Sequence, residues 1–413
     1  MADLLWLAAV ILIILLFFRV FHFASRTEPP VLYHQHSQFV NEIISSCSLL
    51  SQPYVPPFFW GKSGHVQTIV YGKMGRIKPP LPRGTRIERI MPDGATLTFD
   101  IFEPLKPHPT KGDYTMLICP GIANSSESTY IRTLIDHVQN NGFRAAVLNH
   151  LGSLKDVKLT SPRIYTYGGT DEYKTMVEYV SEYYSGSTLI AVGCSMGANV
   201  ISKYLGENPN NQKLFLCGLS ICQGYDLHRF HPKDRLINMP TIMSPFLLSF
   251  EHLRRVYIYA MTLHQVSLLK RNADVLFGGE NSGKYDVNRI FKSTDLKILD
   301  ELYSRRRAGF TNLLDYYAWC SSSNYINNIS IPMLMLNALD DPLVPPDMFD
   351  IPKSFIDKND KSLFVVTKHG GHLGFFESAP KNRLLPRRVT WLDKVIVDYA
   401  NAVINVNENM ASF

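Results

Sequence analysis

The stretch Leu189-Ile190-Ala191-Val192-Gly193-Cys194-Ser195-Met196-Gly197 decides the fold class of this chain. Its four leading apolar residues predict a buried strand, and a helical pattern follows over Ala198–Leu205. A G-x-S-x-G sequence between strand and helix is typical of a sharp turn that exposes the serine hydroxyl at a helix N-terminus. Side chains at Gly193 and Gly197 would collide with neighbouring backbone in such a turn. We therefore predict that Ser195 is a nucleophile; the alternative is a tight turn with an idle serine.

The chain from about residue 86 onward alternates strand-like runs with helical patterns. The expected strands are Arg86–Met91, Leu97–Phe102, Met116–Cys119, Ala145–Asn149, Leu189–Gly193, Phe215–Ile221, Met333–Asn337 and Leu363–Thr367. The expected helices are Tyr130–Asn140, Thr170–Tyr184, Ala198–Leu205 and Thr390–Val403. Apolar strands that alternate with amphipathic helices indicate an α/β fold with a mostly parallel central sheet flanked by helices.

The remaining segments divide the chain around this core. Residues 225–330 lack a convincing core strand but contain apolar helical stretches, which predicts a helical lid insertion between core parts 85–224 and 331–405. Residues 27–84 are rich in Pro, Gly and Ser and are predicted to form an irregular arm. Residues 406–413 are predicted to form a short tail.

The first 26 residues are predicted to form a transmembrane anchor. Leu4–Phe18 is an uninterrupted apolar run, which Val20, Phe21 and Phe23 continue past Arg19. Twenty residues of helix reach about 30 Å, the thickness of a bilayer core. A cleaved signal peptide or a buried soluble helix are the alternatives, although the first three residues carry no basic side chain, which a signal peptide would need.

Composition excludes several classes of protein. Of 413 residues, 46% are apolar and 19% are charged, so the chain is not predominantly disordered. The net charge of +6 is mild and does not indicate a nucleic-acid partner. Six cysteines without a C-x-x-C spacing exclude a disulfide-stapled scaffold and give no indication of a metal site.

Two aspartates compete for the role of an acid that orients a catalytic histidine. They lie in Leu339-Asp340-Asp341-Pro342-Leu343-Val344-Pro345, directly after the expected strand Met333–Asn337. An acid just past a strand end, fixed by prolines, suits that role. We favour Asp341, and Asp340 remains the alternative because it could instead stabilise the turn.

The general base is predicted on the glycine-rich loop His369-Gly370-Gly371-His372-Leu373-Gly374. Glycines allow the close approach that a base on a loop needs. We favour His372, because His369 follows the preceding strand too closely. A metal site at these two histidines would lack a third ligand. The order serine, aspartate, histidine along the chain is that of one large class of hydrolases.

Two backbone N–H groups are the expected donors to a developing oxyanion. One follows the nucleophile and belongs to Met196. The other lies on the loop after Met116–Cys119, where Gly121 lets the backbone turn and Ile122 supplies the N–H.

These residues resemble the α/β-hydrolase superfamily, and more closely its membrane-anchored α/β-hydrolase domain-containing protein two group of acylglycerol lipases. The resemblance rests on Trp60–Thr68, Cys119–Asn124, Asn149–Gly152, Asn337–Val344 and His369–Glu377 and runs from the anchor to about Val403. It implies an α/β-hydrolase fold with Ser195, Asp341 and His372 as nucleophile, acid and base. The family's elbow usually ends in two glycines, and Ala198 replaces the second here.

The resemblance also implies a function and a location. It implies a membrane-bound serine esterase that needs no cofactor and hydrolyses a lipid ester, most simply a monoacylglycerol, at the bilayer. The alternatives are an acyltransferase or phospholipase with the same triad, and a non-catalytic protein that binds a lipid or a steroid. A type II single-pass topology is implied. The sequons at Asn124 and Asn328 would then be glycosylated in the lumen, whereas Arg19 and Arg26 favour the opposite orientation.

Overall fold

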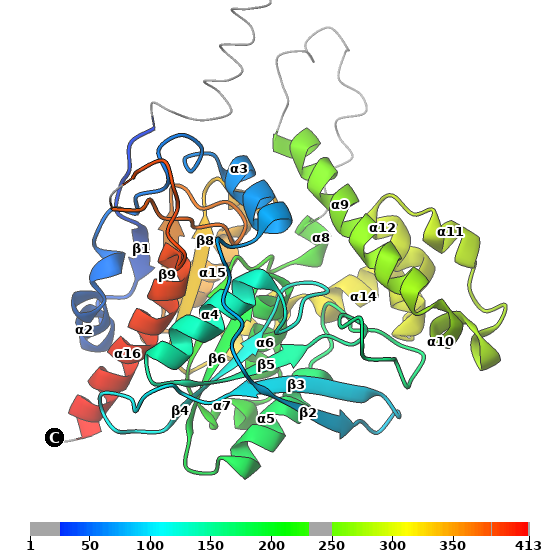
Figure 1. Cartoon of the computed structure of the whole chain (residues 1–413), viewed down its shortest axis with the longest axis horizontal. Helices are drawn as coiled ribbons and strands as arrows, with labels where there is room; N and C mark the ends of the chain where they lie inside the picture. The colour runs from blue at the N-terminus through cyan, green and yellow to red at the C-terminus, as the bar shows by residue number, and fades with distance from the viewer. Residues whose placement is uncertain (1–24, 231–249, 381, 412–413) are drawn as a thin grey trace, which may run out of the picture.

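The computed structural model of the chain describes residues 25–230, 250–380 and 382–411. Within these residues one sheet has the strand order β1-β9-β8-β7-β6-β4-β5-β3-β2 (Figure 1). The strands are β1 (Val31–His34), β2 (Thr85–Ile90), β3 (Thr96–Phe102), β4 (Tyr114–Cys119), β5 (Arg144–Asn149), β6 (Thr188–Cys194), β7 (Phe215–Ile221), β8 (Met333–Ala338) and β9 (Leu363–Thr367). The six central strands β9, β8, β7, β6, β4 and β5 pair in parallel with their neighbours in the sheet. At the two edges, β1 pairs antiparallel with β9, and β3 pairs antiparallel with β5 and β2. The predicted mostly parallel sheet is confirmed.

Helices cover both faces of the sheet. One face packs against α2 (Gln38–Ser46), α4 (Thr129–Asn140) and α16 (Trp391–Ala411). The other packs against α5 (Asp171–Tyr183), α6 (Met196–Glu207) and α15 (Asp350–Ile356). Side chains on β4 alternate between the two cores, since Met116 and Ile118 join the first and Leu117 and Cys119 the second. Burial on both faces explains why these strands read as continuous apolar runs.

The arm contains more regular structure than the sequence predicts. Besides α2 it forms β1, which pairs antiparallel with β9, and α3 (Gly64–Ile69). Serine caps begin both helices: Ser37 accepts the N–H of Val40, and Ser63 accepts the N–H of Val66. The prolines flank these short elements without interrupting them. The four-residue β1 is too short for a periodic signal, and its pairing with β9 is a long-range contact.

The described part of the insertion contains helices joined by turns and includes no strand. Its helices are α8 (Leu227–Phe230), α9 (Phe250–Arg271), α10 (Ala273–Phe277), α11 (Val287–Phe291), α12 (Leu296–Leu299), α13 (Arg305–Arg307) and α14 (Leu313–Cys320). In Figure 1, α9 to α12 gather at one side of the sheet. Their apolar side chains form a core that also includes Ala123 and Met196. The insertion therefore packs directly on the turn that carries Ser195, and its role as a lid stays a prediction.

The predicted anchor, residues 1–26, lies outside the described residues except for Ser25 and Arg26. None of the helices in the described ranges has the length and apolar character needed to cross a bilayer.

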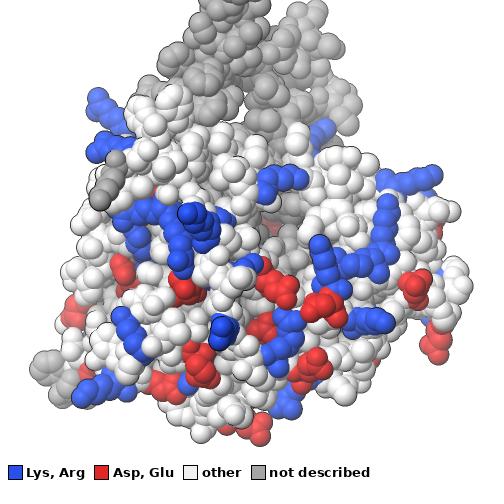
Figure 2. Space-filling model, in the orientation of Figure 1, with Lys and Arg blue, Asp and Glu red and all other residues white. Residues whose placement is uncertain are grey.

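Charged side chains on the visible surface carry both signs. Figure 2 shows Lys and Arg interspersed with Asp and Glu over this face of the molecule. Elsewhere in the described residues, charged side chains form ion pairs, such as Arg86 with Asp100 at 2.8 Å and Arg144 with Asp113 at 2.6 Å. The face in Figure 2 therefore carries both signs of charge.

Candidate active site

Ser195 occupies a strained turn between β6 and α6. Its backbone has φ 56° and ψ −118°, a conformation that costs a non-glycine residue of order 1–3 kcal/mol. The turn is held because the Ser195 N–H donates to the carbonyl of Ile221 at 2.8 Å. A Cβ at Gly197 would lie 2.0 Å from the carbonyl oxygen of Cys119, and one at Gly193 would lie 2.5 Å from the Cα of Ala198. Both glycines are therefore required by close backbone approach.

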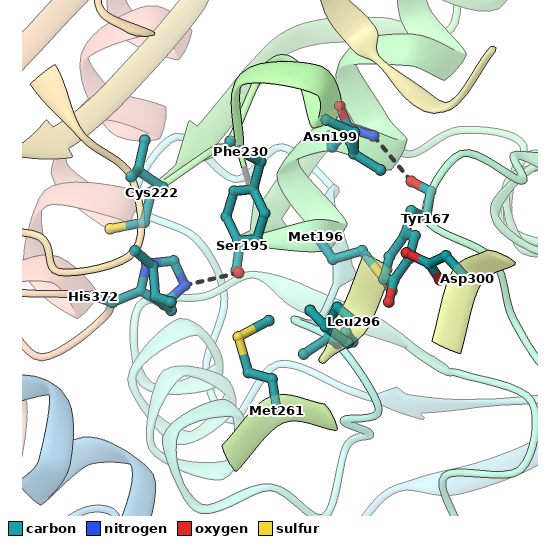
Figure 3. A pocket seen from close by; sticks show the side chains of 15 residues that line it. Tyr167, Ser195, Met196, Asn199, Cys222, Phe230, Met261, Leu296, Asp300 and His372 are labelled. Carbon is teal, nitrogen blue, oxygen red and sulfur yellow. Dashed lines mark hydrogen bonds between the residues drawn. The ribbon is translucent and has the colours of Figure 1, made fainter. Parts of the chain in front are cut away.

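Ser195, His372 and Asp341 lie in one row of hydrogen bonds. The His372 Nε2 is 2.8 Å from the Ser195 Oγ (Figure 3). The His372 Nδ1 is 2.8 Å from the Asp341 Oδ2. The three side chains follow β6, β9 and β8, whose parallel carboxyl ends meet at one edge of the sheet. This arrangement can move a proton from a serine hydroxyl to an imidazole held in one tautomer.

The orientation of this row is set by backbone hydrogen bonds. Asp341 is fully buried, and its Oδ1 accepts the N–H groups of Leu343 at 2.7 Å and Val344 at 3.1 Å. Its Oδ2 is thereby left facing His372. The N–H of His372 donates to the Oγ1 of Thr68 at 2.9 Å, so helix α3 of the arm positions the base. Thr68 ends the stretch Trp60–Thr68 that carries the family resemblance, but no local pattern predicts that its hydroxyl contacts the base.

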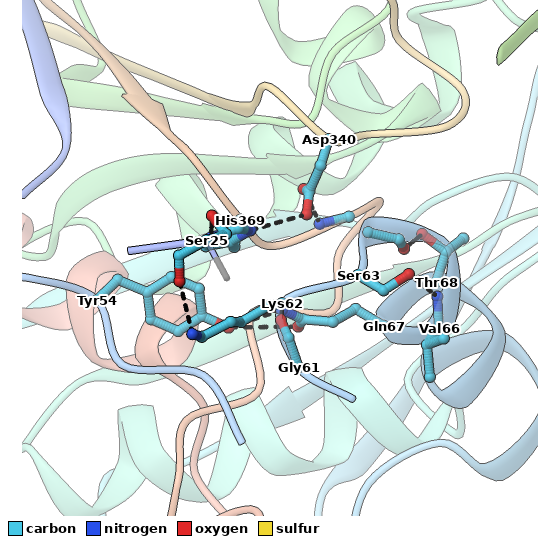
Figure 4. Close-up of polar contacts among 12 residues, drawn as sticks. Ser25, Tyr54, Gly61, Lys62, Ser63, Val66, Gln67, Thr68, Asp340 and His369 are labelled. Atoms are coloured by element: carbon cyan, nitrogen blue, oxygen red, sulfur yellow. Dashed lines mark hydrogen bonds and ion pairs between the residues drawn. The ribbon is translucent and has the colours of Figure 1, made fainter. Parts of the chain in front are cut away.

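The two rival candidates, Asp340 and His369, face each other instead of Ser195. The Asp340 Oδ2 lies 3.5 Å from the His369 Nδ1, and the His369 Nε2 lies 2.9 Å from the hydroxyl of Ser25 (Figure 4). The Asp340 Oδ1 accepts the N–H of Gly371 at 2.8 Å. Burial raises the pKa of Asp340, and His369 and that N–H counteract the rise. This second row therefore ties down the loop that carries His372.

The predicted oxyanion donors lie beside Ser195. Ile122 and Met196 line the same pocket as Ser195, and neither backbone N–H has a partner among the described residues. The hydroxyl of Tyr130 accepts the N–H of Gly121 at 2.8 Å, which holds this loop close to the serine. Two free N–H groups beside a serine hydroxyl could stabilise an anion there.

A mostly apolar pocket opens beside Ser195 and His372. The side chains that line it come from the core and from the insertion: Ile122, Tyr167, Met196, Asn199, Cys222, Leu227, Phe230, Met261, Leu296, Asp300, Leu343 and Val344. Asp300 and Met261 carry no local signal, because the sequence cannot show which insertion residues fold back over the sheet edge.

Cys222 lies close to the row, but its chemistry does not favour a metal. Ligand atoms of Cys222, Asp341 and His372 lie within 4.8 Å of one another. Both ring nitrogens of His372 are already hydrogen-bonded. Burial raises the pKa of the Cys222 thiol well above its usual range, which disfavours the thiolate that binds metals.

The two sequon asparagines differ in exposure. Asn328 is exposed, with its Nδ2 3.0 Å from the carbonyl of Gly206. Asn124 is half-buried, and its Nδ2 donates at 2.8 Å to the carbonyl of Ile122 in the loop beside Ser195. A glycan is therefore easier to accommodate at Asn328.

Comparison with known proteins assigns the chain to a family. The α/β hydrolase fold family matches residues 114–238 and 308–379. Human monoacylglycerol lipase ABHD2 is 42% identical over 408 residues, covering 98% of this chain and 92% of the relative. Abhydrolase domain-containing protein 2 of Drosophila melanogaster is 37% identical over 406 residues, covering 98% of each. Mouse phospholipase ABHD3 is 24% identical over 401 residues, covering 95% of this chain and 89% of the relative. The chain belongs to the α/β hydrolase family, in the group of abhydrolase domain-containing protein 2.

Proposed function

We propose that this protein is a serine hydrolase that cleaves acylglycerol esters, with monoacylglycerols as the first substrates to test. The observation that carries the proposal is the hydrogen-bonded row of Ser195, His372 and Asp341 at an apolar pocket. Relatives named monoacylglycerol lipase, with 42% identity over nearly the whole chain, support the substrate class.

In the proposed mechanism the Ser195 Oγ attacks the ester carbonyl while His372 takes its proton. Asp341 holds the imidazole and stabilises its cationic form. The N–H groups of Ile122 and Met196 stabilise the tetrahedral oxyanion. His372 then protonates the leaving alcohol, and the acyl chain stays on the serine as an ester. Water activated by His372 releases the fatty acid and restores the serine.

We also propose that residues 1–26 anchor the enzyme in a membrane, with the catalytic body on the lumenal or extracellular side. The apolar sequence of this segment supports the anchor. An anchored enzyme meets insoluble lipid esters in the bilayer that holds them. The insertion 225–330 would act as a lid, because its core includes Met196 beside the serine.

The test is fatty-acid release from a long-chain monoacylglycerol by the full-length protein in detergent, beside Ser195→Ala. We expect the variant to lose release to below detection, because loss of a triad nucleophile costs about 10⁶ in kcat. Equal thermal unfolding of parent and variant would show that the loss is chemical.

Three outcomes would contradict the proposal. Transfer of acyl chain to an added alcohol without matching free fatty acid would indicate an acyltransferase, and release only from phospholipids would indicate a phospholipase, the activity in the name of the mouse relative. Lipid binding that Ser195→Ala leaves unchanged, with no turnover by the parent, would indicate a binding protein.

A further inference from the structure

Asp300 places a buried carboxyl in the wall of the apolar pocket. It begins a π-helical turn, Asp300–Ser304, that follows α12 in the insertion. Its side chain lines the same pocket as Ser195, although the residue is only 1% exposed. The Oδ2 accepts the hydroxyl of Tyr317 at 3.0 Å, whereas the Oδ1 has no hydrogen-bond partner among the described residues. The Oδ1 therefore has no donor in hydrogen-bond geometry, although the Ser304 hydroxyl lies near enough to lower the pKa of the carboxyl.

Within the described residues, no lysine, arginine or histidine is among the groups that shift the pKa of Asp300. The titratable groups that face it are Tyr165, Tyr167, Asp295, Tyr316, Tyr317 and Cys320. Burial raises the pKa of the Asp300 carboxyl to about 7, and the hydroxyls of Ser304 and Tyr317 offset part of the rise. A buried carboxyl with an unused acceptor is unfavourable unless a donor reaches it. In a pocket that receives substrate, the substrate can supply this donor.

The position of Asp300 indicates which part of a substrate it would meet. Figure 3 shows Asp300 beyond Met196, on the side of Ser195 away from His372. His372 must protonate the leaving alcohol, so that alcohol lies on the His372 side of the serine. The acyl portion therefore extends toward Asp300 and Leu296.

We infer that Asp300 is a specificity-determining residue whose free carboxyl oxygen accepts a hydrogen bond from a substrate hydroxyl. This inference rests on the proposed function and narrows its substrate class. The hydroxyl can come from a hydroxylated acyl chain, which the position of Asp300 favours, or from the glycerol of the headgroup. A pocket that pairs a buried polar group with a substrate hydroxyl discriminates strongly against the analogue that lacks it.

The experiment measures kcat/KM for three kinds of ester of one chain length. These are a plain methyl ester, methyl esters that carry one hydroxyl at a series of chain positions, and the monoacylglycerol. Parent, Asp300→Asn and Asp300→Leu are compared. We expect Asp300→Leu to lower the preference of the enzyme for a hydroxyl-bearing ester over the plain ester by about tenfold or more. A loss confined to hydroxylated chains identifies the acyl source, and a loss confined to the monoacylglycerol identifies the glycerol.

The asparagine variant adds a pH test that does not depend on cavity shape. An ionised carboxylate accepts a hydrogen bond more strongly than a neutral acid. The preference of the parent for the hydroxyl-bearing ester should therefore rise with pH around the Asp300 pKa of about 7. Asp300→Asn should be flat over this range.

Glu301→Gln is the matched control, because this neighbouring carboxyl pairs with Arg305 and does not line the pocket. It should leave the ester preferences unchanged. An Asp300 series that lowers all three esters equally, or none of them, would overturn the inference while leaving the proposed function intact. If the parent enzyme hydrolyses none of the esters, both the inference about Asp300 and the proposed function are overturned.

Discussion

At the scale of single residues, two adjacent aspartates should differ in their effect on catalysis. Asp341 touches the catalytic base candidate, whereas Asp340 accepts an N–H of the loop that carries it. We expect Asp341→Asn to lower kcat by about 10⁴, because an amide would favour the wrong imidazole tautomer. Asp340→Asn should cost tenfold or less, since its amide oxygen can still accept the N–H of Gly371. Steady-state kinetics on a monoacylglycerol would distinguish them, and a larger loss at Asp340 would reverse the assignment.

Residues of the site could be predicted from the sequence only where a local pattern identifies them. Ser195 lies in a recognisable turn, and both Asp341 and His372 follow predicted strands. Parallel strands bring such loops to one edge, so their proximity follows from the sheet. The positions of Thr68 and Asp300 at the site could not be predicted. Each residue lies in the arm or the insertion, and the sequence does not show how these segments pack against the sheet.

At the scale of elements, the turn from β6 to α6 should not tolerate a side chain at Gly197. An added Cβ would lie 2.0 Å from the carbonyl oxygen of Cys119, so β4 and α6 would have to separate. We expect Gly197→Ala to lower the free energy of unfolding by about 3 kcal/mol or more and to reduce activity. Gly186→Ala is the control, because no atom lies within 4 Å of its added Cβ. Urea denaturation measures both, and equal stability would contradict the packing argument.

The core strands could be predicted to within two residues at each end, because both faces of the sheet are buried. Among the helices, α15 was not predicted, and α16 continues to Ala411, past the predicted end at Val403. The elements of the arm could not be predicted. Its strand β1 depends on β9, more than 320 residues away, and α3 begins at a serine cap inside a Pro-rich stretch. Short elements that depend on distant partners leave no periodic signal in the chain.

At the scale of the whole molecule, the proposed topology predicts where a glycan attaches. If the catalytic body is lumenal, Asn328 should be glycosylated, because it is exposed. Asn124 should not be, because it is half-buried in the loop beside Ser195, where a glycan has less room. The parent and both variants are expressed in cells that glycosylate secretory proteins, and their gel mobility is compared before and after glycosidase treatment. The treatment should change the mobility of the parent and of Asn124→Gln, but not that of Asn328→Gln. The absence of any shift in the parent would argue against a glycosylated lumenal body.

The pairing of β7 with β8 joins the part of the core before the insertion to the part after it. These strands lie side by side in parallel, from Gly218 opposite Met333 to Ile221 opposite Leu336, although the whole insertion separates them in sequence. The nucleophile candidate belongs to the piece before the insertion, and the acid and base candidates belong to the piece after it. A break in the exposed turn at Gly279–Asn281 would therefore yield two fragments, each with an incomplete reaction centre. Neither fragment could assemble the three side chains alone, so activity after such a cut should require both fragments and the pairing of β7 with β8.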